Sequence, residues 1–231
     1  AGFTGTETAR NQRDWANNVT ILSGDIGTPG DPSDNSYHVV TGSSGCSMSG
    51  FTITAGNADG AGANGRGGGL YSTDQSPTLW YCTLSGNSAV TGGAMCFEGG
   101  APEVYHTRFE DNTATGSGGA IARLGGGLVK VHWSVFAGNS AGSGGGGVYC
   151  APGSYFRVFN CTLYANSAAT GGGFSAVDST LEVRNSIVWG NTGGQIAASG
   201  STLKVFYSDV QGGQVGTGNL SCDPLFVDAA S

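Results

Sequence analysis

Charged side chains recur at one fixed place within a repeated segment of this sequence. Nine residues before successive asparagines, and at the equivalent place in the last segment, lie Thr78, Glu103, Lys130, Arg157, Glu182 and Lys204. A polysaccharide lyase would need acidic calcium ligands together with an Arg or Lys base on one face. This charged column contains both signs instead, with no acidic cluster. It favours pairing between neighbouring segments, Glu103 with Lys130 and Arg157 with Glu182, and each exposed pair is worth about 0–1 kcal/mol.

The remaining titratable residues also give little indication of catalysis. A glycoside hydrolase needs two carboxylates about 5–9 Å apart, but Glu103 and Glu182 lie too many segments apart for that. His38, His106 and His132 fit no recognisable triad or metal-binding pattern. We therefore predict no catalytic residues and no metal site, and we keep a lyase-like enzyme as the alternative.

A mostly aromatic column runs beside the charged one. Its members, which we call the aromatic ridge, are Trp80, Tyr105, His132, Phe159, Arg184 and Phe206. Evenly spaced rings on a flat β face suit sugar stacking or protein contact. The other interpretation is that the ridge packs beneath a loop or a terminal segment, and the residues favour neither. The next residues along fall at an inferred bend, so their direction is left unassigned: Tyr81, His106, Trp133, Asn160, Asn185 and Tyr207.

The columns exist because the chain repeats itself. The repeated asparagines are Asn57, Asn87, Asn112, Asn139, Asn166 and Asn191, spaced by 30, 25, 27, 27 and 25 residues. A glycine cluster and a hydrophobe follow each of them, as in GGAM and GGAI. A regular period of this length signals a solenoid, and β-branched, aromatic stretches such as LEVRNSIVW indicate strands. We predict an all-β, single-stranded right-handed parallel β-helix of roughly seven to nine coils.

Two further columns are apolar in every segment, so we expect both to point inward. They are Leu79, Val104, Val131, Val158 and Val183, and Leu84, Phe109, Phe136, Leu163 and Val188. The asparagines should have a structural role. Asn tolerates left-handed backbone at a corner, and its amide can bond to the Asn of the next coil, about 4.8 Å away.

Composition excludes some partners. The 231-residue chain has 44 glycines, only 11% charged residues and a net charge of −7 with two lysines. Nucleic acids and anionic membranes need clustered positive charge, so neither is expected as a partner. No apolar run approaches the ~20 residues of a membrane span, and we predict no membrane insertion.

Six cysteines without a CxxC pair favour an oxidising compartment. Cys150 with Cys161 is the best candidate disulfide, because both should face inward on adjoining strands. The alternative is that several cysteines are small buried hydrophobes. Asp25, Asp31 and Asp34 form a loose acidic loop. Calcium could bind there, but a solvated loop is the favoured interpretation, and no cofactor is predicted.

The FxxN and GGA[IML] alternation resembles the repeats of chlamydial polymorphic membrane proteins and related adhesin passenger domains. A closer resemblance is to bacterial right-handed β-helix repeat proteins of the choice-of-anchor-Q type. It lies in GFTGTETARNQRDW with NVTILSGDIG (2–27), GFTITAGNADG (50–60), and NSIVWGNTG, YSDVQGG and GNLSCDPLFVD (185–228). The resemblance implies a large secreted or surface protein, of which this chain is a part or a processed form.

These observations predict one continuous solenoid domain. We expect N-terminal coils and a loop in 1–45, regular coils in 46–213 and a closing segment in 214–231. The predicted function is a non-catalytic extracellular or cell-surface β-helix serving surface structure, adhesion or filament assembly. The alternative is a β-helix that binds or degrades polysaccharide. Expected partners are further copies stacked end to end, other surface proteins, or glycans.

Overall fold

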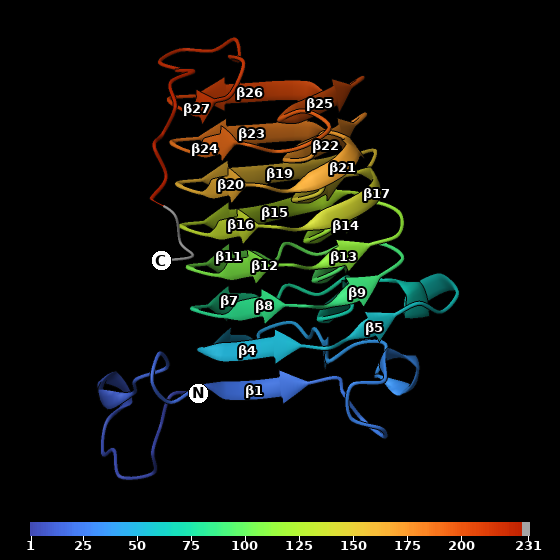
Figure 1. Cartoon of the computed structure of the whole chain (residues 1–231), viewed down its shortest axis with the longest axis vertical. Helices are drawn as coiled ribbons and strands as arrows, with labels where there is room; N and C mark the ends of the chain where they lie inside the picture. Colours follow the sequence, from blue (N-terminus) through green and yellow to red (C-terminus); the bar gives the residue numbers. More distant parts are fainter. Residues whose placement is uncertain (228–231) are drawn as a thin grey trace.

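The chain folds as a right-handed parallel β-helix of about seven turns with almost no helix. This computed structural model describes residues 1–227. Figure 1 shows the coils stacked one above another, with the N-terminal coils below and the later coils above. The predicted fold class is therefore confirmed.

Four parallel sheets run along the stack, three of them with seven or eight strands and the fourth, sheet D, with five. Sheet A contains β1 (Thr20–Ser23), β4 (Phe51–Thr54), β8 (Thr83–Ser85), β12 (Arg108–Glu110), β16 (Val135–Ala137), β20 (Thr162–Tyr164), β24 (Ile187–Trp189) and β27 (Asp209–Val210). Sheet B contains β2 (Val40–Thr41), β6 (Leu70–Thr73), β10 (Met95–Glu98), β14 (Ile121–Leu124), β18 (Val148–Cys150), β22 (Phe174–Val177) and β25 (Ile196–Ser199).

The other two sheets complete each coil. Sheet C contains β3 (Ser47–Ser49), β7 (Thr78–Trp80), β11 (Glu103–Tyr105), β15 (Gly127–His132), β19 (Ser154–Phe159), β23 (Thr180–Arg184) and β26 (Thr202–Phe206). Sheet D contains β5 (Asn57–Ala58), β9 (Ser88–Ala89), β13 (Thr113–Ala114), β17 (Ser140–Gly144) and β21 (Ser167–Thr170). Three 3-10 turns lie outside the coils: η1 (Arg10–Gln12), η2 (Pro32–Asp34) and η3 (Gly62–Gly65).

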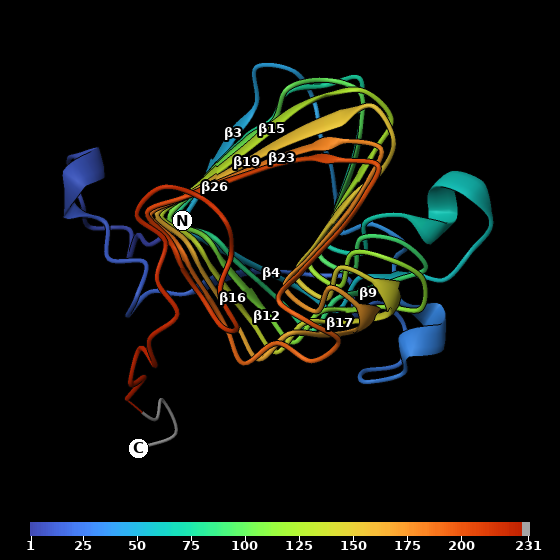
Figure 2. The same cartoon turned by 90° about the horizontal axis from the view of Figure 1, so that it is seen from above.

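Register places like residues directly above one another. Val104 pairs with Val131 across β11 and β15, and Val131 pairs with Val158 across β15 and β19. All three side chains are 0% exposed. Seen from above in Figure 2, successive coils superimpose around one interior. The inward columns thus merge into a single core along the axis, which is how repeats that cannot fold alone become stable.

Corners between the sheets are made by residues with positive φ. Between sheets C and A these are Tyr81, His106 and Trp133, with φ of 52°, 47° and 50°. Between sheets D and B the corner needs glycine, because a Cβ on Gly93 would lie 2.3 Å from the carbonyl oxygen of Gly119 in the next coil. The glycine clusters of the repeat therefore serve close backbone approach.

Candidate functional site

The outer face of sheet C gathers the side chains that could contact a partner. Alternate residues of each strand point outward, so the charged column and the aromatic ridge run up this face in parallel. At its corner with sheet A runs a third set, the corner column: Tyr81, His106, Trp133, Asn160, Asn185 and Tyr207. All six have positive φ, and each of them directly follows a register-paired residue of the ridge.

The charged column forms ion pairs between coils. Lys130 Nζ lies 2.6 Å from Glu103 Oε1, and these residues are register partners on β15 and β11. Arg157 Nε lies 3.2 Å from Glu182 Oε2. Lys204 is the register partner of Glu182, but the second ion pair of Glu182 is with Arg184, whose Nε lies 2.6 Å from Oε1.

Both carboxylates of this face are held in the ionised form. A hydrogen bond from Lys130 and another from Tyr105 lower the pKa of Glu103. Burial alone would raise the pKa of Glu182, but hydrogen bonds from Tyr155 and Arg184 and the charge of Arg157 outweigh burial, so its pKa is also lowered. Neither carboxyl group is therefore suited to donate a proton near neutral pH.

Rings in the lower half of the face stack on one another. Trp80 and Tyr105 have centroids 4.1 Å apart at 13°, and Tyr105 and His132 lie 5.3 Å apart at 14°. In the corner column, His106 stacks on Tyr81 at 4.8 Å and on Trp133 at 5.1 Å. Because each ring face is covered by the next ring, this region shows mainly ring edges to solvent. It is a poorer platform for sugar stacking than the sequence suggested.

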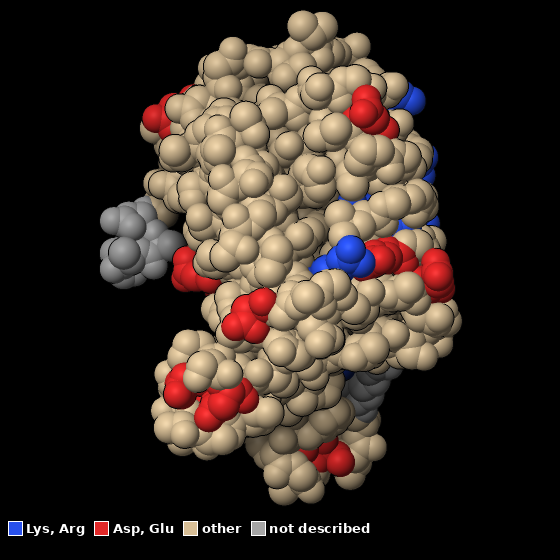
Figure 3. Space-filling view, turned by 90° about the vertical axis from the view of Figure 1, so that its right-hand side faces the viewer, with Lys and Arg blue, Asp and Glu red and all other residues tan. Residues whose placement is uncertain are grey.

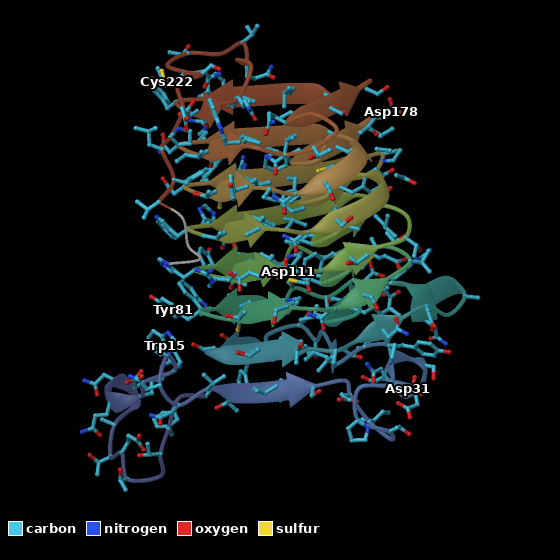
Figure 4. The ribbon with its side chains drawn as sticks, viewed as in Figure 1. Trp15, Asp31, Tyr81, Asp111, Asp178 and Cys222 are labelled. Atoms are coloured by element: carbon cyan, nitrogen blue, oxygen red, sulfur yellow. The ribbon has the colours of Figure 1, made fainter. Side chains whose placement is uncertain are left out.

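A terminal segment extends the corner column downward. Trp15 stacks on Tyr81 with centroids 4.9 Å apart, and the Arg13 guanidinium lies 4.9 Å from the Trp15 centroid. Together with Asn11 they line an open hollow of about 480 Å³. Figure 4 shows Trp15 directly below Tyr81. At this end the N-terminal segment covers the corner column. The sequence analysis considered such a cover for the neighbouring aromatic ridge.

The stack changes character at Phe159. Its ring lies 5.3 Å from that of His132 but at 86° to it. The Arg184 guanidinium lies 5.8 Å from the Phe159 centroid and 5.0 Å from that of Phe206. In the same coils the corner column switches from rings to the exposed amides of Asn160 and Asn185. The upper half of the face therefore combines the turned ring of Phe159 with cations and amides, and rings return in the last coil at Phe206 and Tyr207.

Positive charge is concentrated on this face. Both lysines of the chain, with Arg157 and Arg184, lie here against the two carboxylates of Glu103 and Glu182. The face thus carries an excess of two positive charges on a chain whose net charge is −7. Figure 3 shows the side of the molecule on the right of Figure 1, where most of the visible surface is uncharged.

The repeated asparagines occupy a different corner, between sheets A and D, and form a buried hydrogen-bonded column. The prediction that they hold left-handed backbone is wrong, because the positive φ of this corner falls on the residue before each asparagine, as at Asp111 and Gly138. Asn139 Oδ1 accepts from the backbone N–H of Asn112 at 3.1 Å and from its Nδ2 at 2.9 Å. Asn139 Nδ2 in turn donates to Asn166 Oδ1 at 2.8 Å and to the carbonyl of Phe109 at 2.9 Å. Asn87, Asn112, Asn139, Asn166 and Asn191 share this column and are all buried.

The prediction for Asn57 is corrected. This residue lies one place further along, in β5, where it pairs with Ser88 of β9. Its Nδ2 donates to the carbonyl of Pro32 at 2.8 Å. The column position in that coil belongs to Gly56, whose N–H donates to Asn87 Oδ1 at 3.1 Å. Glycine carries no side chain, so the asparagine column ends there.

A second column, which the sequence analysis missed, lies behind the corner column. Ser134 Oγ accepts the N–H of Thr107 at 3.1 Å and donates to the carbonyl of His132 at 2.9 Å. Ser186 and Ser208 repeat this pattern. The sequence does carry a signal for it. Five residues before each column asparagine stands a small hydroxyl or thiol side chain: Cys82, Thr107, Ser134, Cys161 and Ser186.

The predicted disulfide is also corrected, because all six cysteines, each within the described residues, are free thiols. Cys150 lies on β18 in sheet B. Cys161 lies at the corner between sheets C and A, where its Sγ accepts the N–H of Ser134 at 3.4 Å. Cys161 thus fills a hydroxyl position of the second column, and its packing does not depend on a partner thiol.

Side chains of the last coils close both columns. Asn191 Nδ2 donates to Gln195 Oε1 at 2.7 Å, which takes the place of a further asparagine. Asn219 Oδ1 accepts the N–H of Ser208 at 3.1 Å, and Asn219 Nδ2 donates to the carbonyl of Val205 at 3.0 Å. The columns are therefore satisfied by the chain itself at this end.

The acidic loop uses its carboxylates locally. Asp25 accepts from the N–H of Gly30, Asp31 from that of Ser33, and Asp34 from that of Thr28. Within residues 1–227 no cluster of three or more His, Cys, Asp or Glu side chains has the arrangement of a metal site. In the same part of the chain, no helix has the length and hydropathy needed to cross a membrane.

Fold and site together define a parallel β-helix whose stacked coils present one aromatic and cationic face. Residues 39–209 match the family model described as right handed beta helix region. This match covers well over half of the chain, so the chain belongs to that family. No curated protein and no solved structure matches it.

Proposed function

We propose that this chain is a non-catalytic β-helix protein that acts outside the cell or at its surface in adhesion, with the outer face of sheet C as its contact surface. The observation that carries the proposal is the concentration of exposed rings and excess positive charge on this one face. The continuous core beneath holds these side chains in fixed positions, and a pre-organised surface loses less entropy on binding.

The state of the carboxylates supports binding over catalysis. A general acid of a glycosidase needs a raised pKa, whereas the pKa values of Glu103 and Glu182 are lowered. Both oxygens of Glu182 accept hydrogen bonds, from Tyr155 and Arg157 on one side and Arg184 on the other. These hydrogen bonds fix the ionised carboxylate of Glu182 and the two guanidinium groups in position.

The corner column offers a second line of support. A non-glycine residue in left-handed backbone costs about 1–2 kcal/mol, and Asn tolerates it best. Asn160 and Asn185 show that Asn fits this column. Trp133 occupies it nevertheless and stays 50% exposed. Its stack on His106 and its looser contacts with Tyr105 and His132 return about 0.5–1.5 kcal/mol for a well-formed pair, much of which the left-handed backbone offsets. The net gain to the fold is therefore small, and recognition of a partner gives a reason for Trp at this place.

The resemblance to choice-of-anchor-Q proteins and to polymorphic-membrane-protein repeats belongs to this proposal. Large secreted or surface proteins carry such repeats, and adhesion is a function for which an extended, rigid repeat surface is suited. A secreted location for this chain is proposed on the same ground.

The test is a binding screen against arrayed glycans and immobilised surface proteins. We compare the wild type with the double variant Trp133→Asn, Lys204→Gln, which changes two exposed side chains of the face. Arg108→Gln is the matched control, because Arg108 is an exposed arginine paired with Glu110 on sheet A. We expect the double variant to lose binding at least tenfold and the control to keep it. Equal binding by all three proteins would exclude this face.

End-to-end assembly is the second candidate, favoured by one observation at the lower end. β1 is the edge strand of sheet A, and its Ile21 is 58% exposed. Open strand edges invite pairing with another chain. Sedimentation and negative-stain microscopy over a concentration series test this candidate, and we expect an Ile21→Lys variant to lower any assembly. Dispersed single particles at high concentration would rule assembly out.

A further inference from the structure

We propose that the coil of Phe159 is a subsite for an acidic sugar unit of an extended polysaccharide, with its carboxylate held by Arg157 and Arg184. This inference rests on the proposed function, since it names the ligand class of the same face. The subsite consists of the Phe159 ring, the two guanidinium groups, the amides of Asn160 and Asn185, and Lys204 one coil above Arg184.

The guanidinium groups carry the argument. Arg157 bonds Tyr155 and Glu182 through Nε, and Arg184 bonds Glu182 through Nε. Within residues 1–227, the Nη atoms of Arg157 and Arg184 take part in none of these side-chain hydrogen bonds. By contrast, Arg108 uses both Nε and Nη2 on Glu110. Terminal Nη–H groups form a planar fork that fits a carboxylate in two parallel hydrogen bonds. Glu182 therefore orients two forks and leaves their ends for an incoming anion.

The aromatic part of the subsite is Phe159. Its ring is turned 86° from His132, at the break in the stack. Rings in the coils below lie face to face with their neighbours, so Phe159 is the ridge residue whose orientation departs from that arrangement. The Arg184 guanidinium lies over this ring, 5.8 Å from its centroid, so the C–H groups of a sugar would pack on the part of the apolar ring that Arg184 leaves uncovered. A turned ring beside two forks suits a molecule with both a pyranose body and a carboxylate.

The amides supply partners for hydroxyl groups. Asn185 Nδ2 donates to Asn160 Oδ1 at 3.3 Å, and both residues are exposed. This bond leaves Asn160 Nδ2 as a donor and Asn185 Oδ1 as an acceptor. An amide offers both kinds of group at fixed positions. The amides lie in the coils of the guanidinium groups, so one sugar unit could contact both kinds of group.

Charge complementarity selects the acidic polysaccharide among possible occupants. The face has an excess of two positive charges, which suits a polymer with one carboxylate per unit. Duplex nucleic acid carries one charge per about 1.7 Å of axis, and a chain of net charge −7 would repel it. A neutral glycan would leave the Nη groups without an anionic partner.

The experiment titrates the wild type with a short oligogalacturonate and, as the matched ligand, with its methyl-esterified form, which is neutral. We expect at least tenfold tighter binding of the acid and a loss of affinity on adding salt. Arg184→Gln and Lys204→Gln should each reduce the preference for the acid, Arg184→Lys should keep part of it, and Arg108→Gln should leave it unchanged. Thermal melting of each variant checks that the coils remain folded.

The outcomes separate the two proposals. Equal affinity for the acid and the ester, or an unchanged preference in both Arg184→Gln and Lys204→Gln, overturns the uronate subsite. If, in that case, the Trp133→Asn, Lys204→Gln double variant still loses its partner in the array screen, the adhesive face stands with a different ligand. Tighter binding of a sulfated glycan or an acidic peptide than of the uronate also counts against the subsite as stated.

Discussion

The rings of His132 and Phe159 stand at 86° to each other, although the two residues are register partners on β15 and β19. Below this point the ring faces cover one another. Above it Arg184, Asn160 and Asn185 take the places of rings, which return in the last coil at Phe206 and Tyr207. The step from the coil of His132 to the coil of Phe159 thus divides the face of sheet C into two parts. The lower part is stacked and stiffens the surface, and the upper part is open and has unused hydrogen-bonding groups.

Replacing an interior member of the asparagine column should be costly. Asn139→Ala removes the acceptor for both the backbone N–H and Nδ2 of Asn112 and leaves buried carbonyl groups without a donor. Each unsatisfied buried group costs about 1–3 kcal/mol. We expect the free energy of unfolding to fall by about 3 kcal/mol or more, measured by urea denaturation. Asn57→Ala is the matched control and should cost about 1 kcal/mol. Equal losses would place Asn57 in the column after all.

Cys161→Ser should be well tolerated. The equivalent positions in neighbouring coils are Ser134 and Ser186, whose hydroxyl groups make the same pair of hydrogen bonds. We expect a change in unfolding free energy within about 1 kcal/mol. Cys150→Ser, which puts a hydroxyl among apolar core residues, should cost more. A larger loss for Cys161→Ser than for Cys150→Ser would contradict the hydroxyl column.

Thiol reactivity should follow burial. Burial raises the pKa of Cys96 and of Cys161 to about 12 and raises that of Cys150 further. A thiolate reacts and a buried thiol does not. In the native protein we expect a thiol reagent to label Cys222, which is exposed, fast, with Cys46 slower. The other four should react after unfolding. A melting temperature that drops on adding reductant would instead reveal a disulfide.

Acid should weaken the fold through Glu103 and Glu182. Their pKa values are lowered below the ordinary value of 4.5, so the folded state binds fewer protons than the unfolded state. The stabilisation is fully present above about pH 4.5 and is lost as pH falls through the lowered values. Glu103→Gln should flatten the fall in unfolding free energy on acidification. The same slope in the variant and the wild type would show that this ion pair contributes nothing.

Trp133→Asn should leave stability nearly unchanged. The variant loses the stack on His106 and the looser ring contacts with Tyr105 and His132, where a good pair is worth about 0.5–1.5 kcal/mol, and it relieves left-handed strain of about 1–2 kcal/mol. We expect the midpoint of urea unfolding to shift little. Trp133→Val, with a β-branched residue at positive φ, should be clearly less stable. If Trp133→Asn unfolds the coils, Trp133 is needed for the fold and its exposure is no argument for binding.

The fold and its core could be predicted because inward-pointing residues occur at the same position in each repeat. Val104, Val131 and Val158 show this, since a hydrophobe at a constant distance from a corner can point only one way. The ion pair of Glu103 with Lys130 followed from the same register. The break at Phe159 could not be foreseen, because ring orientation depends on packing in three dimensions.

Two errors and one unassigned position had local causes. Asn57 was assigned to the column by its spacing, but in that coil the corner residue is Gly56, which carries no side chain to mark the position. The direction of the Trp133 side chain could not be predicted either, because an aromatic residue type gives no sign that its backbone is left-handed. The disulfide prediction for Cys161 overlooks its place in a column of Ser and Thr residues, which the sequence does show.

Stacked register has a consequence for how such a chain can change in length. Removing residues 113–139 would take out one 27-residue repeat, from the residue after Asn112 up to and including Asn139. Asn112 would then precede Ser140, and every side chain above would keep its side of the sheet. Removing a single residue from a strand would turn its alternate side chains from core to solvent. The β-helix can therefore lengthen or shorten by whole coils, while smaller insertions and deletions are tolerated only in its loops.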